Sequence, residues 1–498
     1  MAYVARLLMS ERFVMNEIQR LSAVELTNKI RSRELSAREA LQSHIQAIEA
    51  VNAQVNAVVT TDFDRASTLA ATADEITARN GEVGVLHGLP MTHKDTFNTA
   101  GLVSTQGSLA LQHYVPEHDD LQIARLAGAG AIRTGKTNVP EFGAGSHTFN
   151  EVFGTTTNPF APDRSAGGSS GGVAAAVAAR IQPLGDGSDM GGSLRIPASF
   201  CNVVGFRPSY GVIPMESPSN AYSWLARSGP IARTVEDIAL FMRASAGDTA
   251  LPTPNTLKAE DFVAPTPNLR GVRIGYSFDF GIGVPVEPEI IEVLRSQLSV
   301  FEAAGAIVEQ GCIDFTDADE VFGNTRAFDF ATNLGELVRS KESLIKPEVI
   351  WNVRKGWALD GESMISTVAA RTRLEQAVQA YFSRYDLFLS PAAQVLPFDA
   401  AIRWPEQIAG TQAETYLDWM RSACLLSATG LPVISMPGGF TKSGLPVGWQ
   451  LAANHYQDVN LLNWAAGYEE QAPFAATAPL LATNPQSVLA NPVRTISA

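Results

Sequence analysis

The sequence predicts an α/β fold in which helices cover a β-sheet. The chain has 498 residues, of which 45% are apolar and 18% charged, so it is long enough to bury a large core. From about residue 83 onward, short apolar runs alternate with segments of helical periodicity. Alternation of strands and helices is typical of layered α/β proteins.

The N-terminal part predicts helices that form an outer layer. Residues 22–52 contain Ser22–Glu25 and Ser36–Glu39, and both runs match the capping box that starts a helix. Residues 62–80 predict a further helix that ends at Gly81. We therefore expect several amphipathic helices before the first strand.

The rest of the chain predicts buried strands with helices between them. The expected strands are Leu89–Thr92, Ala131–Thr134, Val272–Tyr276 and Val433–Met436. Residues 173–181 predict a helix of small side chains that packs close to the sheet, and residues 287–304 and 362–382 predict helices that cover one face. Proline-rich residues 245–271 predict a surface connection between two halves of one domain, and residues 473–498 a tail rich in Pro and Ala.

Charge and cysteine content exclude several classes of function. The net charge of −14 indicates no general surface for nucleic acid or an anionic membrane. Cys201, Cys312 and Cys424 lie too far apart for a zinc motif or a disulfide framework, so we expect buried thiols in a reducing compartment. No apolar stretch reaches 18 residues and no signal-peptide core begins the chain, so we expect a cytoplasmic protein without a membrane span.

The most informative region is rich in glycine and serine. Gly167–Gly172 contains Ser169, and Gly185–Pro197 contains Ser193, 24 positions further on. Glycine-rich backbone can direct several N–H groups at one point, and a hydroxyl beside such donors suits acyl transfer. A flexible linker and a phosphate loop are the alternatives; the apolar helix that follows disfavours the first, and the missing Gly-x-x-x-x-Gly-Lys-Ser/Thr pattern disfavours the second.

Lys94 is the candidate base for such a serine. Neither serine lies in a Gly-x-Ser-x-Gly elbow, no histidine stands out as a triad partner, and no His-Glu-x-x-His metal motif occurs. Lys94 follows the strand-like run in Gly88–Asp95, and a lysine base must be desolvated to be neutral. A solvated lysine is the ordinary alternative. The neighbouring His93 is open to either a structural or a functional role.

Residues 83–215 resemble the amidase signature family. The matching motifs are Gly88–Asp95, Gly135–Gly143, Gly167–Gly172 and Gly185–Pro208, with weaker similarity at Leu431–Gly439 and Gly444–Gln450. The resemblance implies the amidase signature fold, a large mixed twisted β-sheet covered by α-helices on both faces. With Met15 as an alternative start, we expect an N-terminal extension at 1–14, a helical layer of the same domain at 15–82, and the amidase signature α/β domain at 83–490.

The resemblance also implies a Ser–cis-Ser–Lys triad. Ser193 would be the nucleophile, Ser169 the bridging serine after a cis peptide, and Lys94 the base that starts a proton relay through Ser169. The implied oxyanion hole consists of the backbone N–H groups of Met190, Gly191, Gly192 and Ser193. Gly143 and Met190 are expected to contact the substrate, and no cofactor or metal is implied.

Other polar residues of the motifs receive structural roles. Asp189 and Arg195 are expected to form an ion pair that stiffens the nucleophile loop, with direct substrate recognition as the alternative. Ser170 would stabilise the loop beside Ser169. Asn138 and Glu141 are expected to bond nearby backbone.

Substrate preference is expected to depend on segments outside the motifs. Candidate substrate contacts are Gly143–Asn150, Val321–Phe330, Trp351 and Pro391–Leu396, with ordinary core packing as the alternative for each. These segments are apolar and aromatic, which favours aryl or alkyl amides and leaves carbamates and esters open.

Two other functions are considered as alternatives to amide hydrolysis. The family also contains the glutaminase subunit of a tRNA-dependent amidotransferase, but Ile196 stands where that subunit usually has glutamine, which favours a stand-alone hydrolase. Ser188 and Met190 replace the commoner threonines, and Met190 is expected to narrow the acyl pocket. A non-catalytic binding protein is the second rival, and the intact Lys94, Ser169 and Ser193 argue against it. The sequence leaves open whether the protein forms a homodimer.

Overall fold

The computed structural model describes residues 16–215, 219–221, 223–248 and 254–479. The extension predicted at 1–14 and the last part of the predicted tail, residues 480–498, lie outside these ranges. Within them, no helix is both long enough and apolar enough to cross a membrane.

A mixed eight-stranded sheet forms the centre of the molecule. Its strand order is β12-β11-β13-β17-β16-β9-β10-β8. The first three strands of that order run parallel and all other pairs antiparallel, as expected for a mixed sheet. The strands are β8 (Leu184–Asp189), β9 (Val204–Arg207), β10 (Arg227–Ala232), β11 (Arg273–Tyr276), β12 (Ile307–Gln310), β13 (Leu387–Pro391), β16 (Val433–Phe440) and β17 (Pro446–Ala453).

A second sheet of three strands adjoins β8. Its order is β1-β3-β2, with β2 (Pro90–Lys94) parallel to β3 (Ile132–Thr137) and β1 (Val58–Thr61) antiparallel to it. The layer predicted as helical at 15–82 therefore also supplies a strand. The two-stranded sheets are β4 (Phe149–Asn150) with β5 (Gly154–Thr155), β6 (Thr157–Asn158) with β7 (Ala161–Ser165), and β14 (Gln407–Ile408) with β15 (Thr411–Gln412).

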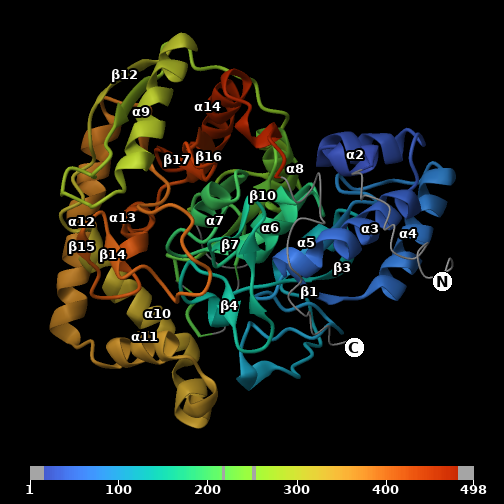
Figure 1. Ribbon diagram of the computed structural model, residues 1–498, viewed down its shortest axis with the longest axis horizontal. Coiled ribbons are helices and arrows are strands. Elements are labelled where there is room, and N and C mark those ends of the chain that lie inside the picture. The colour runs from blue at the N-terminus through green and yellow to red at the C-terminus, as the bar shows by residue number, and fades with distance from the viewer. Residues whose placement is uncertain (1–15, 216–218, 222, 249–253, 480–498) are drawn as a thin grey trace, which may run out of the picture.

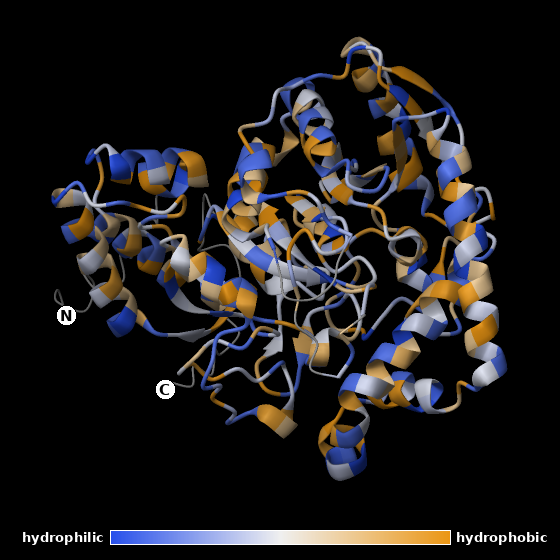
Figure 2. Ribbon diagram, turned by 180° about the vertical axis from the view of Figure 1, so that it is seen from behind, coloured by the Kyte–Doolittle hydropathy of each residue, from blue (hydrophilic) through white to orange (hydrophobic). Residues whose placement is uncertain are grey.

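Helices account for most of the outer surface. They are α1 (Glu17–Arg20), α2 (Ala23–Arg31), α3 (Ala37–Val55), α4 (Phe63–Ala78), α5 (Leu121–Gly128), α6 (Gly171–Ala178), α7 (Arg195–Phe200), α8 (Val235–Ser245), α9 (Pro288–Ala303), α10 (Ala318–Lys341), α11 (Pro347–Trp357), α12 (Gly361–Phe382), α13 (Arg421–Thr429) and α14 (Asp458–Gln471). Figure 1 shows α2, α3 and α4 gathered at one side of the molecule, with α10, α11 and α12 at the other. Along the outer helices, hydrophilic and hydrophobic residues alternate (Figure 2).

Both predicted capping boxes are present. The Ser22 hydroxyl accepts from the Glu25 N–H, and the Glu25 carboxylate accepts from the Ser22 N–H in return. Ser36 and Glu39 make the same reciprocal pair at the start of α3. Each box satisfies two of the N–H groups that a helix start leaves without intrahelical partners.

The central sheet is covered on both faces, as predicted, but the expected placement of two helices is wrong. Helices α9 and α12 were expected on one face, but α9 packs with Leu387 and Leu389 whereas α12 packs with Phe388. Successive side chains of a strand point to opposite faces, so the two helices lie on opposite sides of β13. Apolar periodicity shows that a helix is amphipathic but not which face of a sheet it covers.

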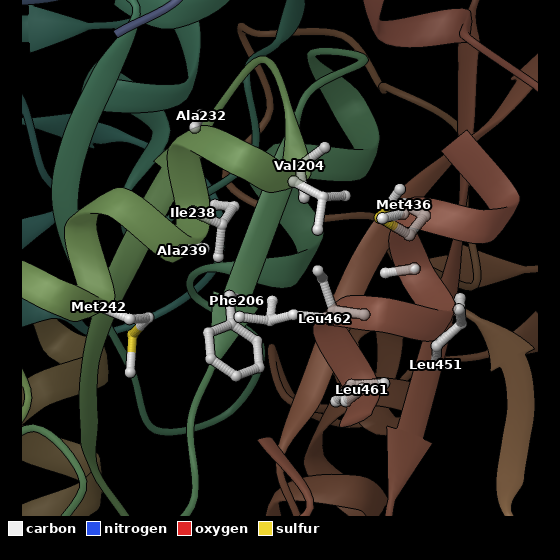
Figure 3. Packing of buried hydrophobic residues seen from close by; sticks show 14 of the residues in the cluster. Val204, Phe206, Ala232, Ile238, Ala239, Met242, Met436, Leu451, Leu461 and Leu462 are labelled. Carbon is white, nitrogen blue, oxygen red and sulfur yellow. The ribbon is translucent and has the colours of Figure 1, made fainter. Parts of the chain in front are cut away.

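The face that α9 covers holds the largest apolar cluster. Figure 3 shows residues of β9, β10 and α8 facing residues of β16, β17 and α14. Phe206 of β9 and Leu462 of α14 are among the buried contacts.

Helix α6 packs as its small side chains predict. All its residues are buried, and a Cβ added at Gly172 would lie 2.4 Å from the Asn138 backbone nitrogen. Only glycine permits this approach. This close contact places the start of α6, which follows Ser169 and Ser170, against the end of β3.

The predicted surface connection is partly anchored in the core. Pro267 is exposed and Pro265 is half-buried, but Phe262 and Leu269 are buried in the cluster beneath α9. The start of the predicted tail is also attached, because the Asn202 side-chain amide donates to the Phe474 carbonyl at 2.7 Å. All three cysteines are free; Cys201 and Cys424 are buried and Cys312 is half-buried.

Candidate active site

Lys94 is the last residue of β2, where this strand lies beside the end of β8. Its side chain is wholly buried. Loss of solvation lowers the pKa of Lys94 to about 7, although the nearby Asp189 and Asp186 carboxylates oppose the shift. A lysine with such a pKa carries a substantial neutral fraction near neutral pH, as a general base requires. The alternative of a solvated lysine is wrong.

Three serine hydroxyls surround the lysine amine. Lys94 Nζ donates to Ser169 Oγ at 2.8 Å, to Ser170 Oγ at 2.9 Å and to Ser188 Oγ at 2.9 Å. The peptide bond between Gly168 and Ser169 is cis, as the resemblance implied. Ser170 does more than stabilise the loop beside Ser169, because its hydroxyl, like that of Ser169, accepts a hydrogen bond from Lys94 Nζ.

Ser193 lies next to this group of hydroxyls. The Ser170 N–H donates to the Ser193 carbonyl at 3.2 Å, so the two glycine-rich loops are joined. Over the described ranges the Ser193 hydroxyl makes no hydrogen bond, and the side chain is almost completely buried. Hydrogen bonds of catalytic groups are often long without substrate, so this geometry is compatible with a nucleophile.

Asp189 and Arg195 form the predicted ion pair. Both side chains are fully buried, and Arg195 Nε and Nη2 each lie 3.0 Å from an Asp189 oxygen. Asp189 also accepts from the Leu194 N–H at 3.0 Å, and the guanidinium of Arg207 lies 3.5 Å away. The neighbouring guanidinium groups hold the pKa of Asp189 well below its usual range, against the effect of its burial. With its carboxylate saturated, Asp189 stiffens the loop and is not open to substrate.

The four N–H groups expected in the oxyanion hole are not equivalent. The Gly192 N–H donates to Asp189 Oδ1 at 2.9 Å, so it already has a partner. In the part of the chain that the structure covers, the N–H groups of Met190, Gly191 and Ser193 have none. Three backbone donors therefore stay available beside the Ser193 hydroxyl.

His93 has a structural role. Its Nδ1 lies 3.0 Å from Asp186 Oδ1 in a fully buried pair, and Asp186 Oδ2 accepts from the Lys94 N–H at 3.3 Å. Asp186 thus joins the histidine to the backbone of the lysine. Asn138 bonds nearby backbone as predicted, accepting from the Val139 N–H at 3.0 Å.

Glu141 also accepts a hydrogen bond from a backbone N–H, but this N–H belongs to a segment distant in the sequence. It accepts from the Lys346 N–H at 2.8 Å and from the Ser108 hydroxyl at 2.5 Å. It holds the loop that carries Gly143 against the start of α11 and takes no part in the group around Lys94.

The contacts of Ser188 and Asp186 with Lys94 were not predicted from the sequence, although Ser188 itself was noted in the motif. Ser188 and Asp186 occupy alternate positions of β8, and their period-two spacing within the Gly185–Pro197 motif was the available signal. Arg195 also donates to the Gln450 side chain, and Gln450 lies in the weaker Gly444–Gln450 motif without a charge or pattern that marks it.

Gly143 and Met190 lie at two edges of the site. A Cβ on Gly143 would approach Ser169 Oγ to 3.3 Å, and its φ is +66°. Met190 is half-buried, and its sulfur lies 3.1 Å from Nη1 of Arg326, a residue of α10. Gly143 therefore lies against the Ser169 hydroxyl, whereas the Met190 side chain contacts α10.

The segments expected to contact substrate fall into three groups. Phe322, Gly323 and Trp351 line a cavity of about 470 Å³ that also touches Cys424 of α13. Pro391 and Gln394 instead bond the side chain of Gln450 and the backbone of Ser422, a structural role. Residues 144–147 and Phe149 border a cavity of only about 10 Å³.

The described residues show no metal-binding geometry. No cluster of three or more His, Cys, Asp or Glu side chains that could hold a metal ion occurs in the ranges described.

Comparison with known proteins shows to which family this chain belongs. A family model described as Amidase matches residues 39–462. An acylamidase of Rhodococcus erythropolis is 34% identical over 465 residues, which cover 92% of this chain and 97% of that protein. A glutamyl-tRNA(Gln) amidotransferase subunit from Thermosynechococcus vestitus is 34% identical over 487 residues, covering 92% of this chain and 99% of that protein.

The fold has a close match among solved structures. A bacterial aryl acylamidase belonging to the amidase signature enzymes superimposes with a TM-score of 0.87 at 29% identity, over 93% of this chain and all of that chain.

Proposed function

The chain belongs to the amidase signature family, and from this premise we propose that it hydrolyses the C–N bond of uncharged linear amides through an acyl-enzyme on Ser193. Aryl and alkyl amides are the preferred class, and carbamates and esters share the same acyl chemistry. Lys94 and Ser169 are proposed as the relay. The backbone N–H groups of Met190, Gly191 and Ser193 are proposed as the oxyanion hole.

One observation carries the proposal: a fully buried lysine amine, with a pKa lowered to about 7, lies 2.8 Å from the hydroxyl of Ser169. A buried lysine without a bonded carboxylate is uncommon as a purely structural element. The same amine contacts two other hydroxyls and no carboxylate oxygen within the parts of the chain described here. The burial of this amine, with no carboxylate bonded to it, favours the neutral amine over the ammonium.

The proposed reaction has two halves. Neutral Lys94 takes a proton from the Ser169 hydroxyl as Ser169 takes one from Ser193, and Ser193 Oγ attacks the carbonyl carbon. The resulting oxyanion is bound by the free N–H groups, and loss of one such donor typically raises the barrier by about 2.7–4 kcal/mol. The relay then returns the proton to the amine nitrogen as the C–N bond breaks. Water, deprotonated by the same relay, hydrolyses the ester and restores Ser193.

The glutaminase subunit of a tRNA-dependent amidotransferase is the second candidate. The 34% identity to a glutamyl-tRNA(Gln) amidotransferase subunit over nearly its full length favours it. Ile196 weighs against it. This side chain is fully buried among Phe200, Leu225 and other apolar residues, so an apolar wall stands where that subunit usually has an amide side chain.

Two measurements on the isolated chain test the proposal. Intact-protein mass after a serine-directed fluorophosphonate should show one adduct in the wild type, none in Ser193→Ala and much slower labelling in Lys94→Ala. The wild type alone should also release 4-nitroaniline from acyl 4-nitroanilides. Unchanged labelling of Ser193→Ala would place the reactive serine elsewhere. Hydrolysis of glutamine, without any hydrolysis of anilides, would favour the amidotransferase function.

A further inference from the structure

Arg227, the first residue of β10, is a buried arginine without a bonded counter-charge. Only 2% of it is exposed, and it forms no ion pair with any residue in the described ranges. Its Nη1 donates to the Ala226 carbonyl at 3.0 Å, and its Nε has no partner. Burial lowers the pKa of Arg227 to about 10, so the guanidinium stays charged at neutral pH. A buried charge without a bonded partner is unfavourable, and a bound anion would relieve this cost.

Two buried carboxylates attract Arg227 without bonding to it. Asp189 is held by Arg195 at 3.0 Å, and Asp458 accepts from the Ser209 N–H at 2.8 Å. A guanidinium carries several N–H donors in a fixed fork. Within the described part of the chain, most of those donors on Arg227 are therefore unused.

Arg227 lines a cavity of about 230 Å³ that α12, α13 and the segment after β17 enclose. Arg371 of α12 lines the same cavity and also forms no ion pair in the described ranges. Three aromatic side chains contribute to the wall: Tyr210, Trp224 and Tyr456. Sites for drug-sized ligands span about 300–1,000 Å³, so this smaller cavity suits a molecule with a single ring.

Both arginines are held by aromatic rings of this wall. The guanidinium carbon of Arg227 lies 4.9 Å from the centre of the Tyr210 ring, and that of Arg371 lies 3.7 Å from the centre of the Trp224 ring. Stacking of this kind fixes the plane of a guanidinium but leaves the N–H donors in that plane available. A carboxylate can accept two parallel N–H groups from such a fork.

The lining carries a net positive charge. Glu375 is the one carboxylate among the described lining residues, against the two arginines. It attracts Arg371, but one of its oxygens lies 3.0 Å from Nε2 of His455 and the other accepts from the Gln379 amide at 2.7 Å. Because both oxygens of Glu375 have other partners, the acid does not neutralise Arg227.

We propose that this cavity binds a small aromatic carboxylate, whose carboxylate group is held by Arg227 with Arg371 as a second contact and whose ring packs on the aromatic wall. Lys94, Ser169 and Ser193 are not among the described residues that line the cavity, so the site is distinct from the candidate active site. Binding there requires no hydrolysis and does not depend on the proposed function.

Isothermal titration calorimetry of the full chain with sodium benzoate tests the proposal. One benzoate per chain should bind with a Kd below about 1 mM. Arg227→Gln should weaken this binding by at least about tenfold, because it removes the charge and the fork that hold the carboxylate. Arg371→Gln changes an exposed residue, so it is expected to fold even if Arg227→Gln does not, and it should weaken binding by about threefold or more.

Arg339→Gln is the matched control. Arg339 also lies over a tryptophan, 4.7 Å from the centre of the Trp357 ring, but it does not line this cavity. This variant should bind benzoate as the wild type does. Two further ligands separate the parts of benzoate: acetate has the charge without the ring, and benzyl alcohol has the ring without the charge. Both should bind at least about tenfold more weakly than benzoate.

The remaining outcomes would each overturn the proposal. Absence of saturable benzoate binding by the wild type would do so, as would binding that both Arg227→Gln and Arg371→Gln leave unchanged, since the ligand would then lie elsewhere. Acetate bound as tightly as benzoate would exclude a role for the aromatic wall. Benzyl alcohol bound as tightly as benzoate would exclude a role for the arginines. None of these results bears on amide hydrolysis, which the serine-directed probe tests separately.

Discussion

The Asp189 carboxylate accepts a hydrogen bond from the Gly192 N–H at 2.9 Å, within the loop that carries the proposed nucleophile. This bond fixes the turn and removes one of the four N–H groups expected in the oxyanion hole. The φ of Gly192 is +105°, a conformation that a side chain would strain. The loop is thus shaped by a buried acid that takes no direct part in the proposed reaction.

Asp189→Asn should destabilise the protein strongly. It would leave the guanidinium groups of Arg195 and Arg207 buried without a counter-charge, which typically reduces the free energy of unfolding by about 3–5 kcal/mol. Urea denaturation monitored by fluorescence measures the loss. The exposed pair of Asp163 with Arg164 gives the control, since Asp163→Asn should change stability by less than about 1 kcal/mol. Equal effects of the two variants would contradict the role of Asp189.

Activity should rise with pH along a limb centred near 7. The pKa of Lys94 is lowered to about 7 by burial, and only the neutral amine can accept a proton, so activity is lost as pH falls through this value. The pH profile of kcat/KM for a neutral anilide measures the limb in the free enzyme. An acidic limb near pH 4, or a flat profile from pH 5 to 9, would exclude Lys94 as the base.

Ser188→Ala should move this limb to lower pH. The Ser188 hydroxyl accepts a hydrogen bond of 2.9 Å from Lys94 Nζ and so stabilises the ammonium form. Without it the pKa of Lys94 falls further, and a hydrogen bond of ordinary strength corresponds to about 0.5–1 pH unit. The same pH profile measures the shift. Movement of the limb to higher pH would mean that the hydroxyl stabilises the neutral amine instead.

Gly143→Ala should reduce kcat by about tenfold or more. The added methyl would lie 3.3 Å from Ser169 Oγ and press on the proposed relay. Gly145→Ala is a close control, because Gly145 also has a positive φ, +98°, but its added methyl would meet only the ring of Tyr416 at 3.5 Å. Both variants should lose about 1 kcal/mol of stability from backbone strain. Equal losses of kcat would show that strain, rather than contact with Ser169, determines the effect.

The fold was readable from the sequence wherever local patterns determine it. The capping boxes at Ser22 and Ser36 appear as expected, because such a box depends only on residues three apart. The prediction that α9 and α12 cover the same face of the sheet was wrong. The face that a helix covers depends on the path of the chain in three dimensions, and hydrophobic periodicity carries no information about that path. Strand β1 was missed because a four-residue strand between two helices leaves little periodic signal.

In the candidate site too, local motifs could be recognised from the sequence, whereas contacts that depend on three-dimensional packing could not. Glycine-rich motifs drew attention to Lys94, Ser169 and Ser193, and the structure joins Lys94 to Ser169 directly. The partner of the Gly192 N–H was not predictable, because the direction of one amide depends on three-dimensional geometry around Asp189. The cavity of about 470 Å³ was suggested by the aromatic character of 321–330 and by Trp351, but that these segments share one cavity follows from how α10 and α11 pack together.

The bonds of Arg195 have a consequence for how the protein is made. Arg195 donates to Ser427 Oγ at 2.6 Å and to the Ala423 carbonyl at 3.1 Å, and it also bonds the side chain of Gln450. All three partners come from the last fifth of the chain, more than 200 positions after the loop that they hold. On the ribosome, a nascent chain would expose both serines and the lysine long before α13 and β17 exist. The active enzyme should therefore emerge only at the end of translation, and chains that terminate early should be inert rather than partly active.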